Sequence, residues 1–176
     1  RQKLLSHSKV ENRVRAEKIF SVVNSDRAKI IESYKSVAEL RGDLAKGHAL
    51  YVQNCATCHQ LNGEGHPVGP NLGTMADKTV QSFVVALLDP NQAVDPTFAA
   101  YTIVTKDERE LSGVIASETP TSISLKIPAG SEEVVLRNNI KGLNRLSTSL
   151  MPEGFETALK PQDMADLIFY VLNAHP

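Results

Sequence analysis

The spacing of apolar residues changes along this chain and predicts helices at both ends with strands between them. Between residues 9 and 40 we expect two helices, because the polar run Asn24-Ser25-Asp26 interrupts the pattern and supplies a capping residue. The apolar positions of the second helix form one amphipathic face: Ile30, Ile31, Tyr34 and Val37. Such a pair is typical of a small bundle or of the end of a helical repeat array.

Three further helices are expected in the rest of the chain. One opens at Gly42-Asp43 and runs into Cys55, another covers residues 79–88, and the last extends from Pro161 to about Asn173. The second ends before Asp89-Pro90, because the residue before a proline avoids the helical region. A proline at the first helical position does no harm, since the N–H group there has no partner within the helix.

Between about residues 100 and 140 the pattern becomes that of strands. Four short runs rich in β-branched residues are separated by turn residues, and they cover residues 101–105, 111–116, 122–127 and 134–137. We therefore expect a small antiparallel sheet of about four strands, inserted at about residues 100–141 in an otherwise helical chain.

Composition places the chain among globular proteins and excludes several partners. Its 176 residues, 41% hydrophobic and 22% charged, are enough to bury a core in one domain, or in one domain with appendages. The 19 basic and 20 acidic residues give no overall field that would attract nucleic acid or anionic lipid. Apolar runs are too short for a membrane span. No secretion signal is readable, which predicts either a cytoplasmic chain or a fragment of a longer exported one.

The two cysteines lie three positions apart and are followed by a histidine, in the segment Cys55-Ala56-Thr57-Cys58-His59. This is the C-x-x-C-H pattern of covalent c-type haem attachment. Two thiols on one turn add to the two vinyl groups at one edge of the porphyrin, and the adjacent imidazole then ligates the iron. The motif predicts one covalent haem c per chain.

Two other uses of the same cysteines are less well supported. A zinc half-site needs a second Cys/His pair at suitable spacing, whereas the other four histidines stand singly. A thioredoxin-like redox pair follows a strand, whereas the sequence before Cys55 is helical. Both alternatives therefore lack a feature that they require.

Met151 is the best candidate for a second axial ligand. Pro152 forces it into an extended conformation and Gly154 suits a tight loop, which together present the thioether toward a metal. A neutral sulfur stabilises reduced iron and raises the potential, as electron transfer requires. The alternative is a methionine that fills the core, which fits Met164 in the last helix and Met75 in a polar loop better.

Together these residues resemble a class I cytochrome c. Gly69-Pro70-Asn71-Leu72 is similar to the family loop whose proline carbonyl accepts the N–H of the proximal imidazole and whose leucine packs on the haem. The resemblance thus implies that Pro70 fixes the tautomer of His59 and that Leu72 binds the cofactor. It also implies that the loop containing Met151-Pro152 supplies the second ligand of the haem iron.

The same resemblance predicts where the first helix crosses the last. Gly47 and Tyr51 are similar to the family's small and aromatic pair at that crossing, with Leu167 and Tyr170 as their counterpart. His59 and Met151 lie 92 residues apart (151 − 59), more than the minimal fold requires. Removing the β-rich stretch restores a normal separation, which favours an insertion at a loop.

Several blocks resemble the planctomycete/verrucomicrobial-type haem-binding domain more closely, at residues 63–72, 88–96, 105–113 and 149–154. This resemblance implies a mainly α, cytochrome c-like fold around one covalent haem for residues 42–176, after a separate helical segment at residues 1–41. In that family the cytochrome often ends a long exported chain with a dehydrogenase-like module. It therefore implies a redox partner protein or a fused dehydrogenase, and a periplasmic or otherwise extracytoplasmic location.

The expected function is that of an electron carrier rather than an enzyme. A haem sensor or peroxidase-like domain, in which the sixth position opens, is the alternative; the Met151 candidate and the lack of a recognisable distal His/Arg pair favour electron transfer. The β insertion either docks a partner or covers the haem and holds the Met151 loop. His66 is either an alternative ligand or gating base or, more simply, a solvent-exposed loop residue.

Overall fold

The computed structural model describes residues 8–174, apart from the side chains of residue 13 and of residues 16–25. The α-helices described are α2 (Val10–Ser33), α3 (Leu44–Asn54), α4 (Val80–Leu88), α5 (Phe155–Ala158) and α6 (Pro161–Asn173). The strands described are β1 (Gln60–Leu61), β2 (Glu64–Gly65), β3 (Ala100–Thr105), β4 (Glu110–Glu118), β5 (Ser122–Lys126), β6 (Glu132–Leu136) and β7 (Ile140–Arg145). Within residues 8–174, no helix is both long enough and apolar enough to cross a bilayer.

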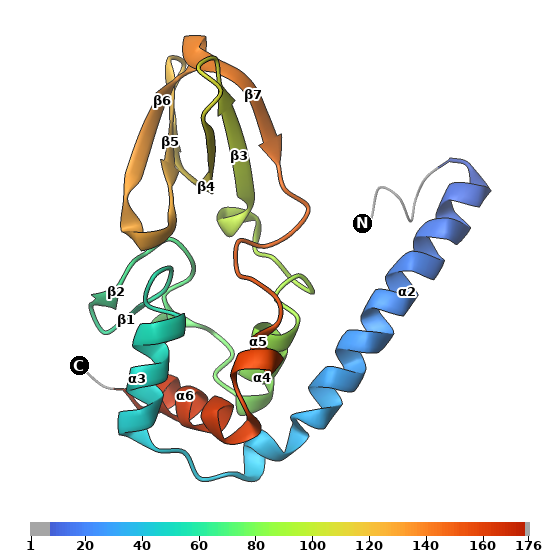
Figure 1. The fold of residues 1–176 in the computed structure, drawn as a ribbon, viewed down its shortest axis with the longest axis vertical. Coiled ribbons are helices and arrows are strands. Elements are labelled where there is room, and N and C mark those ends of the chain that lie inside the picture. Colours follow the sequence, from blue (N-terminus) through green and yellow to red (C-terminus); the bar gives the residue numbers. More distant parts are fainter. Residues whose placement is uncertain (1–7, 175–176) are drawn as a thin grey trace.

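The expected N-terminal pair of helices is wrong. One helix, α2, runs without interruption through residues 24–26, and a short 3₁₀ helix, Lys35–Glu39, follows it. Asn, Ser and Asp are weak helix formers, but each costs only about 0.7 kcal/mol or less relative to alanine, so a short polar run does not end a helix by itself. In Figure 1 the first half of α2 extends away from the body of the molecule, and its second half reaches the other helices.

The amphipathic face predicted for residues 30–37 is confirmed. Tyr34 and Val37 are buried in the helical core, and Ile30 and Ile31 pack against the same core. The C-terminal half of α2 is thus attached to the helical body by apolar contacts.

The three later helices are confirmed, and each begins at a local capping signal. The Asp43 carboxylate accepts hydrogen bonds from the N–H groups two and three positions later, at 2.9 and 3.0 Å, and so starts α3. The Thr79 hydroxyl caps α4, which ends at Leu88 as expected. Pro161 opens α6, whose bounds are those predicted.

Helices α3 and α6 cross in close contact at Gly47. A Cβ atom at this position would lie 2.0 Å from the carbonyl oxygen of Asp166 and 2.6 Å from Cβ of Tyr170, so the crossing requires glycine. The ring of Tyr51, one turn later, has its centroid 5.6 Å from that of Tyr170. The crossing implied by the resemblance is therefore present, and Leu167, on the same helix as Tyr170, is buried.

Strands β3–β7 form one antiparallel sheet in the order β6-β5-β4-β3-β7. Its own apolar cluster contains Ile103, Ile123, Leu125 and Val135. Four of its five strands were predicted. The fifth, β7, lies at an edge and leaves most of its side chains exposed, so its sequence lacks the apolar alternation of a half-buried strand. The sheet reaches Arg145, and because it is larger than expected the description "mainly α" is not confirmed.

The sheet leaves and rejoins the helical part at neighbouring points. Tyr101 in β3 pairs with Arg145 in β7, and the N–H group of Leu146 donates to the carbonyl of Ala100 at 2.8 Å. At the turn between β5 and β6, the N–H group of Ala129 donates to the carbonyl of Thr57 at 2.9 Å. The β insertion therefore contacts the segment that carries the two cysteines.

Candidate functional site

The segment from Cys55 to His59 forms a tight turn at the end of α3. The N–H group of Cys55 donates to the carbonyl of Tyr51 at 2.8 Å, and the carbonyl of Cys55 accepts from the N–H groups of Cys58 and His59 at 3.0 and 2.8 Å. A helix thus precedes the cysteines, where a thioredoxin-like pair has a strand. The turn places both sulfur atoms and the imidazole at one cavity.

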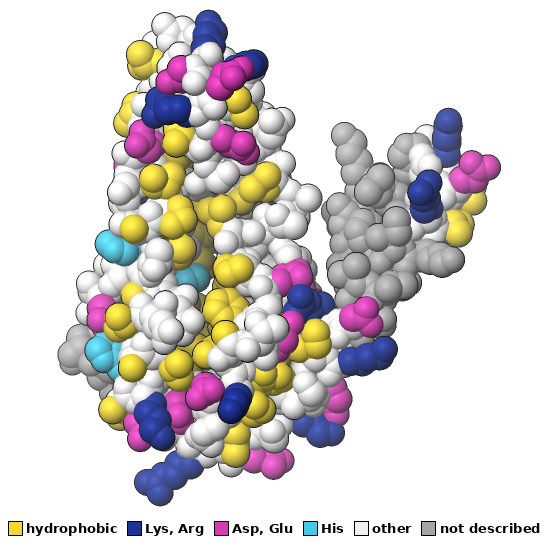
Figure 2. Space-filling model, in the orientation of Figure 1, with side chains coloured by type: hydrophobic (Ala, Val, Ile, Leu, Met, Phe, Trp, Pro, Cys, Tyr) yellow, Lys and Arg dark blue, Asp and Glu magenta, His cyan; other side chains and the backbone are white. Residues whose placement is uncertain are grey.

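All of the site residues expected from the sequence line this one cavity: Cys55, Cys58, His59, Pro70, Leu72 and Met151. The cavity has a volume of about 780 Å³ and a largely apolar wall. Figure 2 shows apolar side chains gathered along a hollow between the sheet and the helices. Its size and lining are those of a site for a large apolar cofactor.

Other walls of the cavity come from elements that the sequence did not assign to the site. Phe83 of α4, Leu167 of α6 and Val114 of β4 all line it. Met75 lines it as well, whereas Met164 is fully buried in the core. No local signal marks Met75 or Val114, because the loop and the strand that carry them approach the motif only in three dimensions.

The His59 ring is fixed by backbone atoms on two sides. Its Nδ1–H donates to the carbonyl of Pro70 at 2.8 Å, the contact implied by the resemblance, and this leaves Nε2 as the nitrogen available to a metal. A Cβ atom on Gly69 would lie 2.8 Å from Cε1 of His59, so the glycine makes room for the ring. Burial lowers the pKa of His59, partly offset by the Pro70 hydrogen bond, which favours the neutral form that binds a metal.

The two cysteine side chains are free thiols in an environment that keeps them protonated. Burial, together with the neighbouring Cys58, raises the pKa of Cys55 to about 12, and burial also raises the pKa of Cys58. Within residues 8–174, no three or more His, Cys, Asp or Glu side chains are grouped so that they could hold a metal ion.

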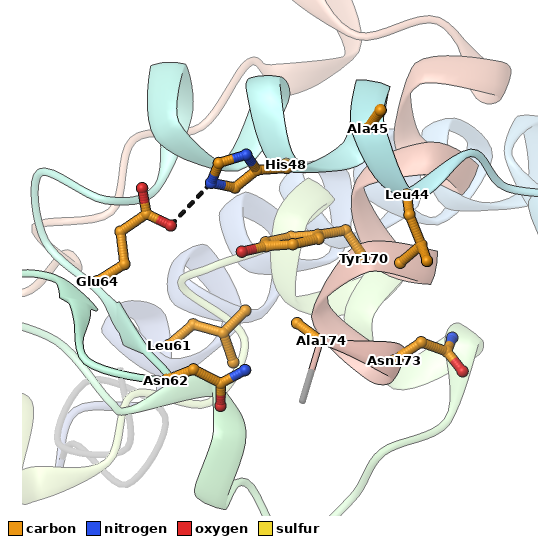
Figure 3. A pocket seen from close by; sticks show the side chains of 9 residues that line it. All are labelled: Leu44, Ala45, His48, Leu61, Asn62, Glu64, Tyr170, Asn173 and Ala174. Carbon is orange, nitrogen blue, oxygen red and sulfur yellow. Dashed lines mark hydrogen bonds and ion pairs between the residues drawn. The ribbon is translucent and has the colours of Figure 1, made fainter. Parts of the chain in front are cut away.

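The β1–β2 hairpin after the motif is held by α3 and α6. The buried hydroxyl of Tyr51 lies 2.9 Å from the carbonyl oxygens of both His59 and Glu64. On the outside, His48 Nε2 lies 2.8 Å from the Glu64 carboxylate, and its ring contacts that of Tyr170 in a tilted arrangement with centroids 5.0 Å apart (Figure 3). These contacts fix the backbone of His59 on the side away from the cavity.

We expect Tyr51→Phe to lower the free energy of unfolding by about 1–2 kcal/mol at neutral pH, because one hydroxyl serves two buried carbonyls. Burial raises the pKa of Tyr51 to about 12, whereas the pKa of a tyrosine in the unfolded chain is near 10. Between about pH 10 and pH 12, the hydroxyl therefore keeps its proton in the folded state and loses it in the unfolded state. The stabilising contribution is thus fully present below about pH 10 and is lost as pH rises through 12. Denaturant unfolding from pH 7 to 12, with Tyr101→Phe as control, measures this. A wild-type-minus-variant difference independent of pH contradicts the assignment.

Comparison with known proteins identifies the part of the chain that contains this motif. The Cytochrome c family model matches residues 44–110. The match supports a class I-like c-type cytochrome module in this part of the chain. A cytochrome c-553-like protein of Synechocystis sp. is 31% identical over 67 residues, which are 38% of this chain and 58% of that protein, so the chain spans less than two thirds of its relative.

The predicted c-type cytochrome and its haem c cofactor are confirmed by these matches. Cytochrome c domains bind haem c covalently, so haem c is the cofactor that these matches support for residues 44–110. The residues fit the group: two thiols and a neutral imidazole with a free Nε2 line one apolar cavity. The matched residues end before Met151, so the match does not test the expectation that Met151 is the second axial ligand.

Proposed function

We propose that this chain is an electron-transfer module with one haem c, attached at Cys55 and Cys58 and ligated by His59 and Met151. The observation that carries the proposal is that these four side chains line the same cavity, although Met151 follows His59 by 92 residues (151 − 59). When bound, the haem iron takes up and gives up one electron at a time.

The residues around the cavity have defined roles in this proposal. Pro70 holds the His59 ring with Nε2 toward the iron, and Gly69 provides the room for the ring. Leu72 and Phe83 exclude water from the cofactor. An apolar wall and a neutral thioether both favour the reduced, less charged iron and so raise the potential.

The wider context is also a proposal. We infer that residues 42–176 form the cytochrome domain, with the sheet as an insertion, and that residues 1–41 precede it as an N-terminal helical segment. A fused or separate dehydrogenase would supply the electrons, since the module itself contains a cofactor for single-electron steps. An extracytoplasmic location is consistent with a cysteine pair that is used in thioethers rather than kept as thiols.

Absorption spectra of the oxidised and reduced holoprotein test the proposal. A six-coordinate, His/Met-ligated haem gives the weak far-red charge-transfer band of ferric iron bound to sulfur, and its ferrous form binds carbon monoxide slowly. If that band is absent and carbon monoxide binds at once, the sixth position is open, and the haem sensor or peroxidase-like alternative is the better description.

The cysteine variants test the attachment. We expect Cys55→Ala and Cys58→Ala each to leave one thioether and one unsaturated vinyl group, which shifts the pyridine haemochrome band toward that of free protohaem. Each variant should also lower the free energy of unfolding of the holoprotein by on the order of 2 kcal/mol, because a covalent link confines the unfolded chain as a disulfide does. If acidified solvent extracts the haem from the wild type as readily as from the double variant Cys55→Ala/Cys58→Ala, covalent attachment at these two cysteines is contradicted.

A further inference from the structure

An arginine on α2 holds the loop that carries Met151. Arg27 Nη2 lies 2.7 Å from Oε2 of Glu153, and Nη1 lies 2.8 Å from Oε1 of Glu156. The same Nη1 donates to the carbonyl of Leu88, at the end of α4, at 3.2 Å. One side chain thus joins α2 to the Met151 loop, to α5 and to α4.

Asn91 holds the same loop from the other side. Its amide NH₂ donates to the second oxygen of the Glu153 carboxylate, and its amide oxygen accepts from the N–H group of Ser149 at 2.7 Å. The hydroxyl of Ser149 in turn accepts from the N–H group of Met151 at 3.1 Å. Both oxygens of Glu153 therefore have partners, and the network reaches the backbone of the proposed ligand itself.

Regular secondary structure does not define the shape of the loop, although Met151 packs against the helical core. Residues 146–154 form neither helix nor strand, and the loop ends at Gly154 with φ +100°. The Arg27 and Glu156 side chains are only 17% and 19% exposed, so this ion pair is screened less by solvent than a surface pair. The polar network is thus placed to decide how often the loop opens.

We propose that Arg27 is a positioning residue that keeps the Met151 loop closed and so limits how often small ligands reach the sixth position of the iron. The inference rests on the proposed function, in which Met151 is that ligand.

A second contact of the same region separates this role from general docking of the helix. The hydroxyl of Tyr34, just after α2, donates to the carbonyl of Leu159 at 2.7 Å and to that of Glu156 at 3.2 Å. It attaches the end of α2 to the body without any bond to residues 149–153. Loss of this hydroxyl loosens the helix but leaves the Met151 network in place.

The test compares holoprotein variants by the rate at which ferric protein binds imidazole, a probe that must displace the methionine. At saturating imidazole this rate reports how often the loop opens. We expect Arg27→Gln to raise it about tenfold, equivalent to about 1.4 kcal/mol, and to weaken the far-red band, with partial recovery in Arg27→Lys. Tyr34→Phe and Lys29→Gln, which removes an exposed charge from the same helix, should stay within about twofold of the wild type.

A double-mutant cycle closes the test. Glu153→Gln should accelerate imidazole binding less than Arg27→Gln does, because Arg27 keeps its ion pair with Glu156 in that variant. The double variant should exceed Arg27→Gln by little, because the Arg27–Glu153 ion pair is already lost in the single variant. If Tyr34→Phe accelerates binding as much as Arg27→Gln, or if Arg27→Gln equals Lys29→Gln, the positioning role is overturned while His/Met ligation stands. If the wild-type ferric protein lacks the far-red band, His/Met ligation itself is contradicted, and the role of Arg27 with it.

Discussion

Replacing Met151 with alanine should remove the far-red band of the ferric holoprotein and lower its reduction potential by on the order of 0.1 V, within the roughly 0.8 V over which axial ligands set haem potentials. The reason is that Met151 lines the cavity that holds His59, and its loss takes away the thioether that favours reduced iron. Spectra and a redox titration measure both effects, and cyanide should bind the variant faster than the wild type.

Met75 and Met164 are the matched controls for this substitution. Met75 lines the same cavity, and Met164 is a fully buried core residue, so Met75→Leu and Met164→Leu remove a thioether without removing the proposed ligand. Both should keep the far-red band. A band that persists in Met151→Ala but disappears in Met75→Leu would transfer the ligand role to Met75.

Gly47→Ala should lower the free energy of unfolding by about 3 kcal/mol or more. The added methyl group would meet the carbonyl oxygen of Asp166 at 2.0 Å, and that atom belongs to the backbone of α6, so relief requires the whole helix to move. This exceeds the gain of about 1 kcal/mol that alanine brings to a helix interior. Guanidinium unfolding of the holoprotein, followed by circular dichroism, measures the change.

Gly142→Ala is the control for this prediction. At Gly142 the nearest atom to an added Cβ lies 3.8 Å away, an ordinary contact, and the change should stay within about 0.5 kcal/mol. Since α6 also carries Leu167 at the cavity wall, Gly47→Ala should in addition broaden the haem absorption bands. Equal stability of the two variants would mean that α3 and α6 do not cross as the structure shows.

Local sequence was sufficient wherever one short segment determines the structure. The caps at Asp43 and Thr79 and the proline at position 161 fix helix starts through bonds within a few residues, and the Cys55–His59 turn is local in the same sense. The bounds of α6 and the cofactor could therefore be predicted. The polar run at residues 24–26 was misleading for the same reason, since it was weighed without the helix on either side of it.

Contacts between segments that are distant in the chain could not be predicted from local sequence. Strand β7 is identifiable only by its pairing with β3, because its own side chains are mostly exposed. In the sequence, Arg27 is one of several charges on a helix surface. Only the structure shows that it lies beside Glu153, which is 126 positions later in the chain. The resemblance supplied the contact between His59 and Pro70, and nothing comparable pointed to Arg27 or Met75.

The pairing of Tyr101 with Arg145 changes the entropy of closing the loop between the two proposed ligands. Without the sheet, His59 and Met151 would be joined by 92 flexible positions (151 − 59). Once β3 and β7 pair, the chain effectively passes straight from residue 101 to residue 145, which roughly halves that loop and lowers its closure cost by about 0.6 kcal/mol. Hairpins β4–β6 therefore add chain length to the molecule at almost no entropic cost to the closure of this loop.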